Sequence, residues 1–248
     1  MGNNGKTLVG WIKEEFAMVT EKSDRSLNLS LLFACIMLFV YCYFGSFSFY
    51  EKAFAGTPEV GYWRIIYHHC TFFALMFVLG LVFIKLVLRQ SPKDYGLAFD
   101  HKKLSVILIL IGIPMAALSG LTSETDEQLT ATYPLIDLNM YRTWQYVLGY
   151  YVSYFLYYIG WEFLFRGLLL NASKKAMGVV GAILFTTMIS ALIHTSIAAF
   201  GKPMIETLSA IPAGIIFGYI AHKTQSIYPT LIIHAMIGFF TDWFIFFL

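Results

Sequence analysis

The sequence predicts an all-α, polytopic transmembrane helix bundle, and two features of its composition support this fold class. Hydrophobic residues make up 58% of the 248 residues, and charged residues only 13%. A soluble domain carries about 25% charged residues, which solvate its surface. The apolar residues also gather in runs of about 20, which is the length that crosses a bilayer core. We therefore expect residues 1–248 to form a single transmembrane domain.

Seven apolar runs are candidates for membrane spans, and the sixth is the shortest of them. They lie at residues 27–50, 65–88, 104–121, 143–170, 178–200, 205–221 and 227–248. Residues 1–26 precede them as an amphipathic segment, in which Leu8, Trp11, Ile12, Phe16 and Val19 recur at helical spacing. This spacing in a mixed-charge segment predicts a helix that lies along the membrane surface.

The placement of lysine and arginine predicts the orientation in the membrane. With the N-terminus inside, eleven of these residues fall in cytoplasmic segments and four on the opposite side. The eleven are Lys6, Lys13, Lys22, Arg25, Arg89, Lys93, Lys102, Lys103, Lys174, Lys175 and Lys223; the four are Lys52, Arg64, Arg142 and Lys202. Such an excess is typical of cytoplasmic loops. We expect a multi-pass protein of a bacterial cell membrane, with a cytoplasmic N-terminus and the C-terminus outside.

Charge and cysteine content exclude several classes of partner. A formal net charge of +2 gives no reason to expect nucleic acid binding. Cys35, Cys42 and Cys70 lie in or beside apolar runs and lack CxxC spacing. Neither a metal knuckle nor a disulfide framework follows from that pattern.

The ionisable residues inside the spans are the candidate site residues. A charge at the bilayer centre costs about 2.5–3.5 kcal/mol on insertion scales, so each one needs a partner or a function. Glu162 and Arg166 lie four residues apart in the fourth span and share a helix face. His194 lies in the fifth span and His234 in the seventh.

Each of these residues also has a purely structural interpretation. Glu162 and Arg166 are explained equally well by an ion pair that pins one helix, and a lone histidine in a span usually forms an interhelical hydrogen bond. Tyr154 and Tyr158, which continue the Glu162 face, suit an aromatic core. The convergence of one carboxylate and two imidazoles from three spans favours the other interpretation. It predicts a site that activates a water molecule inside the membrane.

These segments resemble the motifs of the CPBP family of CAAX proteases and bacteriocin-processing membrane proteins, also called Abi or type II CAAX prenyl endopeptidase-like proteins. The family has Glu-Glu-x-x-x-Arg, Phe-x-x-x-His and His-x-x-x-Asn or Asp motifs. Residues 161–167, Trp-Glu-Phe-Leu-Phe-Arg-Gly, match the first motif beyond its leading position. His194 and His234 match the histidines of the second and third. The resemblance covers residues 143–248, the motif-bearing core.

The resemblance implies an intramembrane endopeptidase that works without a cofactor, with membrane lipid and a peptide or lipidated-protein substrate as its partners. The substrate class is a membrane-associated, prenylated or leader peptide. Glu162 would activate the water with help from His194, and Arg166 would tune the carboxylate. His234 would donate to the oxyanion. Two histidines and a carboxylate also make a hydrolytic zinc set, but no HExxH spacing supports it, so metal-free chemistry is preferred.

Three positions depart from the family motifs. Trp161 replaces the first glutamate, and Ser190 replaces the phenylalanine of the second motif. Gly238 replaces the Asn or Asp of the third, which leaves an oxyanion-stabilising position empty. Trp161 and Gly238 favour the alternative function, a non-catalytic CPBP-like membrane immunity or peptide-binding scaffold protein.

The predicted depths of the site residues do not agree. At about 1.5 Å per residue from the predicted inner ends, Glu162 and His234 lie roughly 11–12 Å deep, whereas His194 lies about 24 Å deep. The three converge only if the fifth span begins later than Gly178, or if it tilts.

Overall fold

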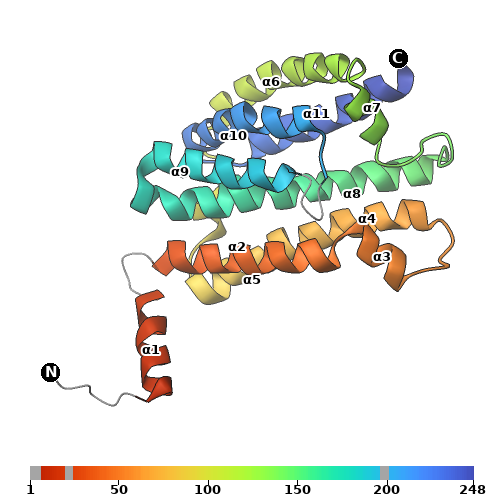
Figure 1. Ribbon diagram of the computed structural model, residues 1–248. Helices are drawn as coiled ribbons and strands as arrows, with labels where there is room; N and C mark the ends of the chain where they lie inside the picture. The colour runs from red at the N-terminus through yellow and green to blue at the C-terminus, as the bar shows by residue number, and fades with distance from the viewer. Residues whose placement is uncertain (1–6, 20–24, 196–200) are drawn as a thin grey trace.

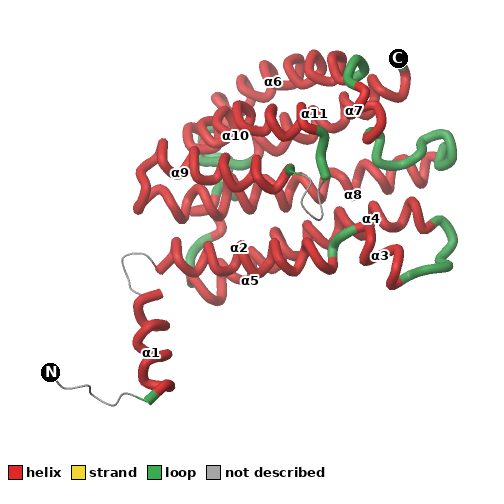
Figure 2. The backbone as a smooth tube through the Cα atoms, in the orientation of Figure 1, coloured by secondary structure: helices red, strands yellow, loops and turns green. Residues whose placement is uncertain are grey.

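Every regular element in the described part of the chain is a helix. The computed structural model describes residues 7–19, 25–195 and 201–248, and no strand occurs within them (Figures 1 and 2). Six helices in these residues are long and apolar enough to cross a membrane. The protein is therefore an integral, multi-pass membrane helix bundle, which confirms the predicted fold class.

The amphipathic segment contains one helix, α1 (Leu8–Val19). Leu8, Val9 and Ile12 are exposed on it. Residues 1–6 and 20–24 of the segment lie outside the described residues. A position along the membrane surface stays a prediction for this helix.

The first span ends earlier than predicted. Helix α2 (Arg25–Phe44) stops before Gly45, and a new short helix, α3 (Phe47–Ala53), follows. Ser46 caps α3 by accepting a hydrogen bond of 3.3 Å from the backbone N–H of Phe49. Residues 45–50, predicted as part of the span, therefore belong to a break and a second helix.

The second and third spans agree with the prediction to within a few residues. The second is a continuous series of α4 (Val60–Phe72), η1 (Phe73–Val78), α5 (Leu79–Phe83) and η2 (Ile84–Leu88). A short 3₁₀ turn, η3 (Pro92–Tyr95), leads to the third, α6 (Lys102–Ser123), and α7 (Glu127–Thr132) follows.

The fourth and fifth predicted spans are one helical stretch of 51 residues, Trp144–His194, made of α8 (Trp144–Glu162), η4 (Phe163–Leu169) and α9 (Leu170–His194). Gly178 interrupts it with φ 69° and ψ 173°, a conformation open to glycine. Trp161 precedes Gly178 and His194 follows it, yet their ring centroids lie 4.9 Å apart. A straight helix would separate them by about 50 Å. The chain therefore turns back at Gly178, so both predicted passes exist although they form one of the six long helices.

The last two spans are α10 (Met204–Thr224) and α11 (Tyr228–Phe247). Residues 196–200, predicted as the end of the fifth span, lie outside the described residues. The start of α11 is fixed to the loop after η3, because the backbone N–H of Ile227 donates to the carbonyl of Gly96 at 3.0 Å.

Helix α8 occupies the centre of the bundle. It lies between a group formed by α2, α4 and α5 and a group formed by α6, α10 and α11 (Figure 1). All residues from 160 to 170 are buried, since this stretch has neighbours on every side. The central position explains why Glu162 and Arg166, which lie in it, face protein rather than lipid.

Candidate functional site

The candidate site is built around a buried carboxylate on the central helix. Glu162 is 0% exposed, and Arg166 one turn later is 5% exposed. The Arg166 Nη1 donates to Oε1 of Glu162 at 3.2 Å, and Nδ1 of His234 donates to the same oxygen at 2.7 Å. The guanidinium of Arg166 also lies 5.6 Å from the ring centre of Phe217 on α10. Helices α8, α10 and α11 thus meet at Glu162.

The second imidazole reaches the same region because the chain reverses at Gly178. His194 ends α9, and its ring packs edge-on against that of Trp161 at 4.9 Å. Its Nδ1 donates to the carbonyl oxygen of Ser190 at 2.6 Å. A carbonyl can only accept, so Nδ1 carries the hydrogen and the neutral ring presents a lone pair on Nε2.

The predicted mismatch in depth disappears for a specific reason. The fourth span does not end at Leu170 but continues as helix to the reversal at Gly178. Glu162 and His194 therefore lie at similar distances along the chain from the same turn. His234 joins them because α11 begins close to the site.

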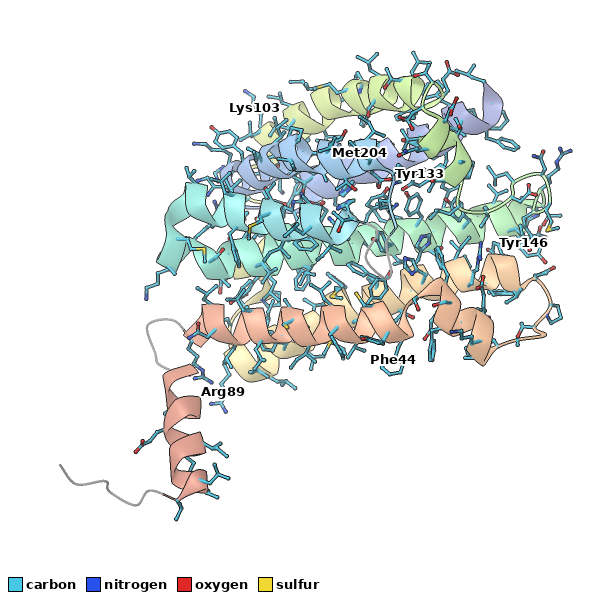
Figure 3. All side chains as sticks on the ribbon, viewed as in Figure 1. Phe44, Arg89, Lys103, Tyr133, Tyr146 and Met204 are labelled. Carbon is cyan, nitrogen blue, oxygen red and sulfur yellow. The ribbon has the colours of Figure 1, made fainter. Side chains whose placement is uncertain are left out.

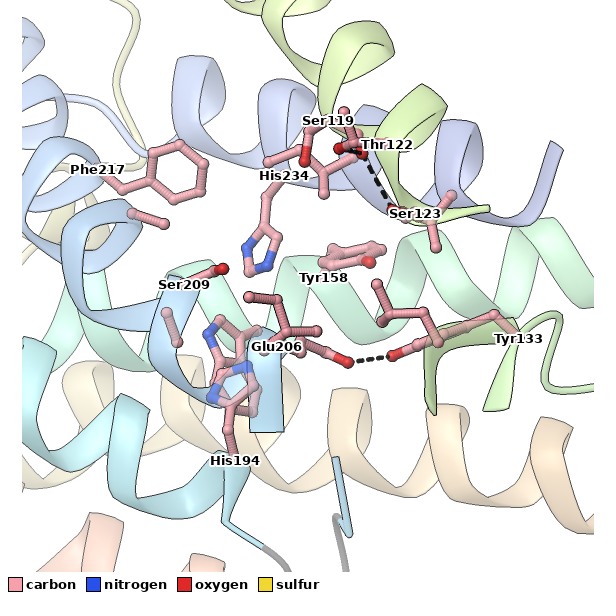
Figure 4. Close-up of a pocket in the computed structure, with 18 of the residues that line it drawn as sticks. Ser119, Thr122, Ser123, Tyr133, Tyr158, His194, Glu206, Ser209, Phe217 and His234 are labelled. Atoms are coloured by element: carbon pink, nitrogen blue, oxygen red, sulfur yellow. Dashed lines mark hydrogen bonds between the residues drawn. The ribbon is translucent and has the colours of Figure 1, made fainter. Parts of the chain in front are cut away.

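A cavity of about 570 Å³ lies beside these residues. His194, His234 and Tyr158 line it (Figure 4). Arg166 and Trp161 are also among its lining residues. Glu162 does not line it, and its carboxylate is covered by His234, whose side chain is 19% exposed. The structure thus brings the four predicted residues together, but it separates the carboxylate from the cavity by one imidazole ring.

Sequence analysis missed the two carboxylates that reach the cavity, those of Asp126, which caps α7, and Glu206. Glu206 in the first turn of α10 lines the cavity and accepts a hydrogen bond of 2.9 Å from the hydroxyl of Tyr133. Lys202 forms an ion pair of 3.2 Å with Glu206 and also donates to the Tyr133 hydroxyl. Burial and the nearby Glu206 carboxylate raise the pKa of Tyr133 well above its ordinary value, so the phenol stays protonated. An acidic residue in the first turn of a predicted span was the only sequence signal for Glu206.

The position that was predicted to be empty at Gly238 is filled by a phenol. A Cβ added at Gly238 would overlap the hydroxyl oxygen of Tyr158 and lie 3.0 Å from that of Tyr154. The ring of Tyr158 packs against the His234 ring with centroids 4.6 Å apart. Both tyrosines line the cavity. A polar donor therefore stands where α11 lacks a side chain, and it comes from α8.

The donor set for a metal ion is incomplete in the described chain. No group of three or more His, Cys, Asp or Glu side chains lies close enough together to hold an ion among residues 7–19, 25–195 and 201–248. Nδ1 of His234 is engaged by Glu162 and that of His194 by Ser190. Their Nε2 atoms are the ring nitrogens left to act on a substrate or a water.

Comparison with known families places this site in a recognised domain. Residues 143–240 match the family model described as Type II CAAX prenyl endopeptidase Rce1-like. The match contains Glu162, Arg166, His194 and His234 and lies within the predicted core at 143–248. Comparisons with curated proteins and with solved structures give no match. Through residues 143–240 the chain is similar to the Rce1-like type II CAAX prenyl endopeptidase family, which confirms the resemblance that its three motifs predict.

Proposed function

We propose that the protein is an intramembrane endopeptidase that hydrolyses a peptide bond in a membrane-associated substrate by a water activated through a glutamate–histidine pair. One observation carries the proposal: Glu162 accepts a hydrogen bond from His234 at 2.7 Å, and the other side of that imidazole borders a cavity shared with His194. The family match at residues 143–240 supports the same reaction class.

The burial of Glu162 changes the roles expected from the motifs. A carboxylate that does not border the cavity is poorly placed to take a proton from water directly. We assign the proton acceptor to Nε2 of His234, which is free to accept because Nδ1 donates to Glu162. The negative charge of Glu162 then stabilises the imidazolium that forms, and Arg166 holds the carboxylate in place.

The remaining groups fit the later steps. The water oxygen attacks the carbonyl carbon as its proton passes to His234, and the carbonyl oxygen becomes an oxyanion. The Tyr158 hydroxyl donates to that oxyanion, and Nε2 of His194 accepts from the attacking water. His234 then returns its proton to the amide nitrogen as the C–N bond breaks, which yields a carboxylic acid and an amine.

Orientation and surroundings complete the proposal. The excess of lysine and arginine in the connections on the N-terminal side supports a cytoplasmic N-terminus and an outer C-terminus. We place the protein in a bacterial cell membrane, working without a metal or other cofactor. Reporter fusions at each terminus test the orientation, and the opposite pattern of reporter activity would refute it.

A second candidate function rests on Trp161. Its ring lies in the cavity wall against His194, where the family motif has a glutamate. A cavity walled by an indole is suited to holding an apolar peptide side chain, so the alternative is a non-catalytic peptide-binding or immunity protein. Such a protein would bind peptide without cleaving it.

Purified protein in detergent, incubated with a library of hydrophobic peptides, tests the proposal. Glu162→Gln should lower the cleavage rate at least about 100-fold, because the variant no longer stabilises a charged His234. Asp242→Asn is the matched control. Asp242 is also a fully buried acid, but it accepts from Tyr150 at 2.9 Å and does not line the cavity. Equal rates in the wild type and Glu162→Gln would sink the assignment, and peptide binding without any cleavage would favour the scaffold.

A further inference from the structure

The cavity has an open end and a closed end. Its exposed lining residues are Ser119, Thr122 and Thr125 at the end of α6 and Ile205 and Ser209 at the start of α10. All of them lie within about two turns of the end of α6 or the start of α10. The segment after α6 contacts the start of α10, because the backbone N–H of Met204 donates to Gln128 on α7 and the Tyr133 hydroxyl donates to Glu206. The cavity therefore opens where α6 ends and α10 begins.

The opposite end is sealed by packing. Arg166 and Phe217 form the deep wall and are each 5% exposed. Beyond them, Thr224 and Thr230 are 0% exposed and Leu231 is 5% exposed, which fills the space between α10 and α11. Among the described residues, none that lines the cavity lies beyond these packed side chains.

The closed end coincides with the basic end of the bundle. Arg89 and Lys103 lie toward one end, and Tyr133 and Tyr146 toward the other (Figure 3). The basic end also carries Arg25 and Lys102, which begin α2 and α6, Lys223 in the last turn of α10, Lys93 in η3, and Lys174 and Lys175, which precede the reversal at Gly178. By the positive-inside rule this end is cytoplasmic. The mouth of the cavity therefore faces the other side of the membrane.

The mouth has the chemistry of a peptide-binding surface. Its exposed hydroxyls on Ser119, Thr122, Thr125 and Ser209 both donate and accept hydrogen bonds, as the backbone of an extended peptide requires. Of the two carboxylates there, that of Glu206 is paired with Lys202, and that of Asp126 accepts hydrogen bonds from the backbone N–H groups of Gln128 and Leu129. Both carboxylates therefore have partners within the protein.

We propose that the scissile bond enters from the extracytoplasmic side, so that the substrates are membrane-anchored polypeptides whose cleaved segment lies outside the cytoplasm. A lipidated C-terminus confined to the cytoplasmic face does not reach the site. This inference rests on the proposed endopeptidase activity and on the orientation argued above. It adds the side of entry and, with it, the class of substrate.

The experiment uses one membrane-impermeant quenched peptide that the detergent-purified protein cleaves. The peptide is added to spheroplasts, which expose the outer face, and to sealed inverted vesicles, which expose the cytoplasmic face. We expect cleavage by spheroplasts and at least a tenfold lower rate with intact inverted vesicles, restored when detergent opens them. Cleavage by sealed inverted vesicles and none by spheroplasts would overturn the inference.

Thiol labelling tests the side of the mouth without any activity. In a background with Cys35, Cys42 and Cys70 changed to serine, Ser209→Cys places a thiol in the mouth and Lys103→Cys places one at the basic end. An impermeant maleimide should label Ser209→Cys in spheroplasts and Lys103→Cys only in inverted vesicles. The reverse labelling would refute the inference. A lack of cleavage in detergent would refute the endopeptidase proposal alone, because the labelling result stands by itself.

Discussion

The hydroxyl of Tyr158 lies in the space that a side chain at residue 238 would enter. The two residues come from α8 and α11, and Gly238 permits the close approach because it has no Cβ. The family that the motifs resemble has an Asn or Asp at this position. The Tyr158 hydroxyl on α8 therefore occupies the place of the side chain that α11 lacks at Gly238. A hydrogen-bond donor is present there although residue 238 is a glycine.

Gly238→Ala should destabilise the protein by about 1–3 kcal/mol, because its methyl group meets a phenol that buried neighbours hold in place. Thermal unfolding in detergent measures the effect. The same change in a Tyr158→Phe background should cost less, since the colliding hydroxyl is gone. If the two changes were additive to within about 0.5 kcal/mol, the contact between these residues would not be the cause.

Tyr158→Phe should lower kcat by about 10²–10³-fold and leave KM nearly unchanged, because the lost donor acts on the oxyanion rather than on the bound peptide. Tyr157→Phe is the control. Tyr157 is the sequence neighbour of Tyr158 but points to the other side of α8, where its ring lies 5.4 Å from that of His69. Tyr157 does not line the cavity. Similar losses in both variants would argue against a role for Tyr158 in the reaction.

Arg166→Met should destabilise the bundle by about 3–5 kcal/mol, because it leaves the buried Glu162 carboxylate without its cation. Adding Glu162→Gln to this variant should recover part of the loss, since the uncompensated charge is then removed. Unfolding midpoints of the two variants give the comparison. A double variant less stable than Arg166→Met would contradict the pairing.

Gly178→Ala should cost about 1–3 kcal/mol, because φ of 69° with ψ of 173° is a conformation that residues with a Cβ rarely adopt. No atom in the described part of the chain lies within 4 Å of the added Cβ, so the cost is conformational and does not come from steric crowding. Gly61→Ala, at a helical position where the nearest atom is the Tyr141 hydroxyl at 3.7 Å, should cost nothing. Activity should fall with Gly178→Ala as well, because the reversal carries His194 to the cavity.

Chelators should leave the cleavage rate unchanged, since the described chain has no cluster of three or more metal-ligating side chains. Metal analysis of the purified, active protein should find less than stoichiometric zinc. Loss of activity with a chelator, restored by added zinc, would favour the metal chemistry that the sequence also permits.

The sequence by itself determined the fold class and the approximate spans, and it singled out four candidate site residues. Apolar runs report directly on burial in lipid, and ionisable residues are conspicuous there because of their desolvation cost. Glu162, Arg166, His194 and His234 were found in this way, and the structure brings them to one place. Their order along the chain also predicted the family resemblance, because three motifs in the right order are specific even where each motif alone is weak.

Only the tertiary structure decided which groups face the cavity. The reversal at Gly178 placed His194, and the covering of Glu162 by His234 removed the carboxylate from the cavity wall. Glu206 and Tyr158 appeared there instead. Such facts depend on how helices rotate and approach one another. Rotation and approach are set by contacts between residues far apart in the chain, which local spacing does not record.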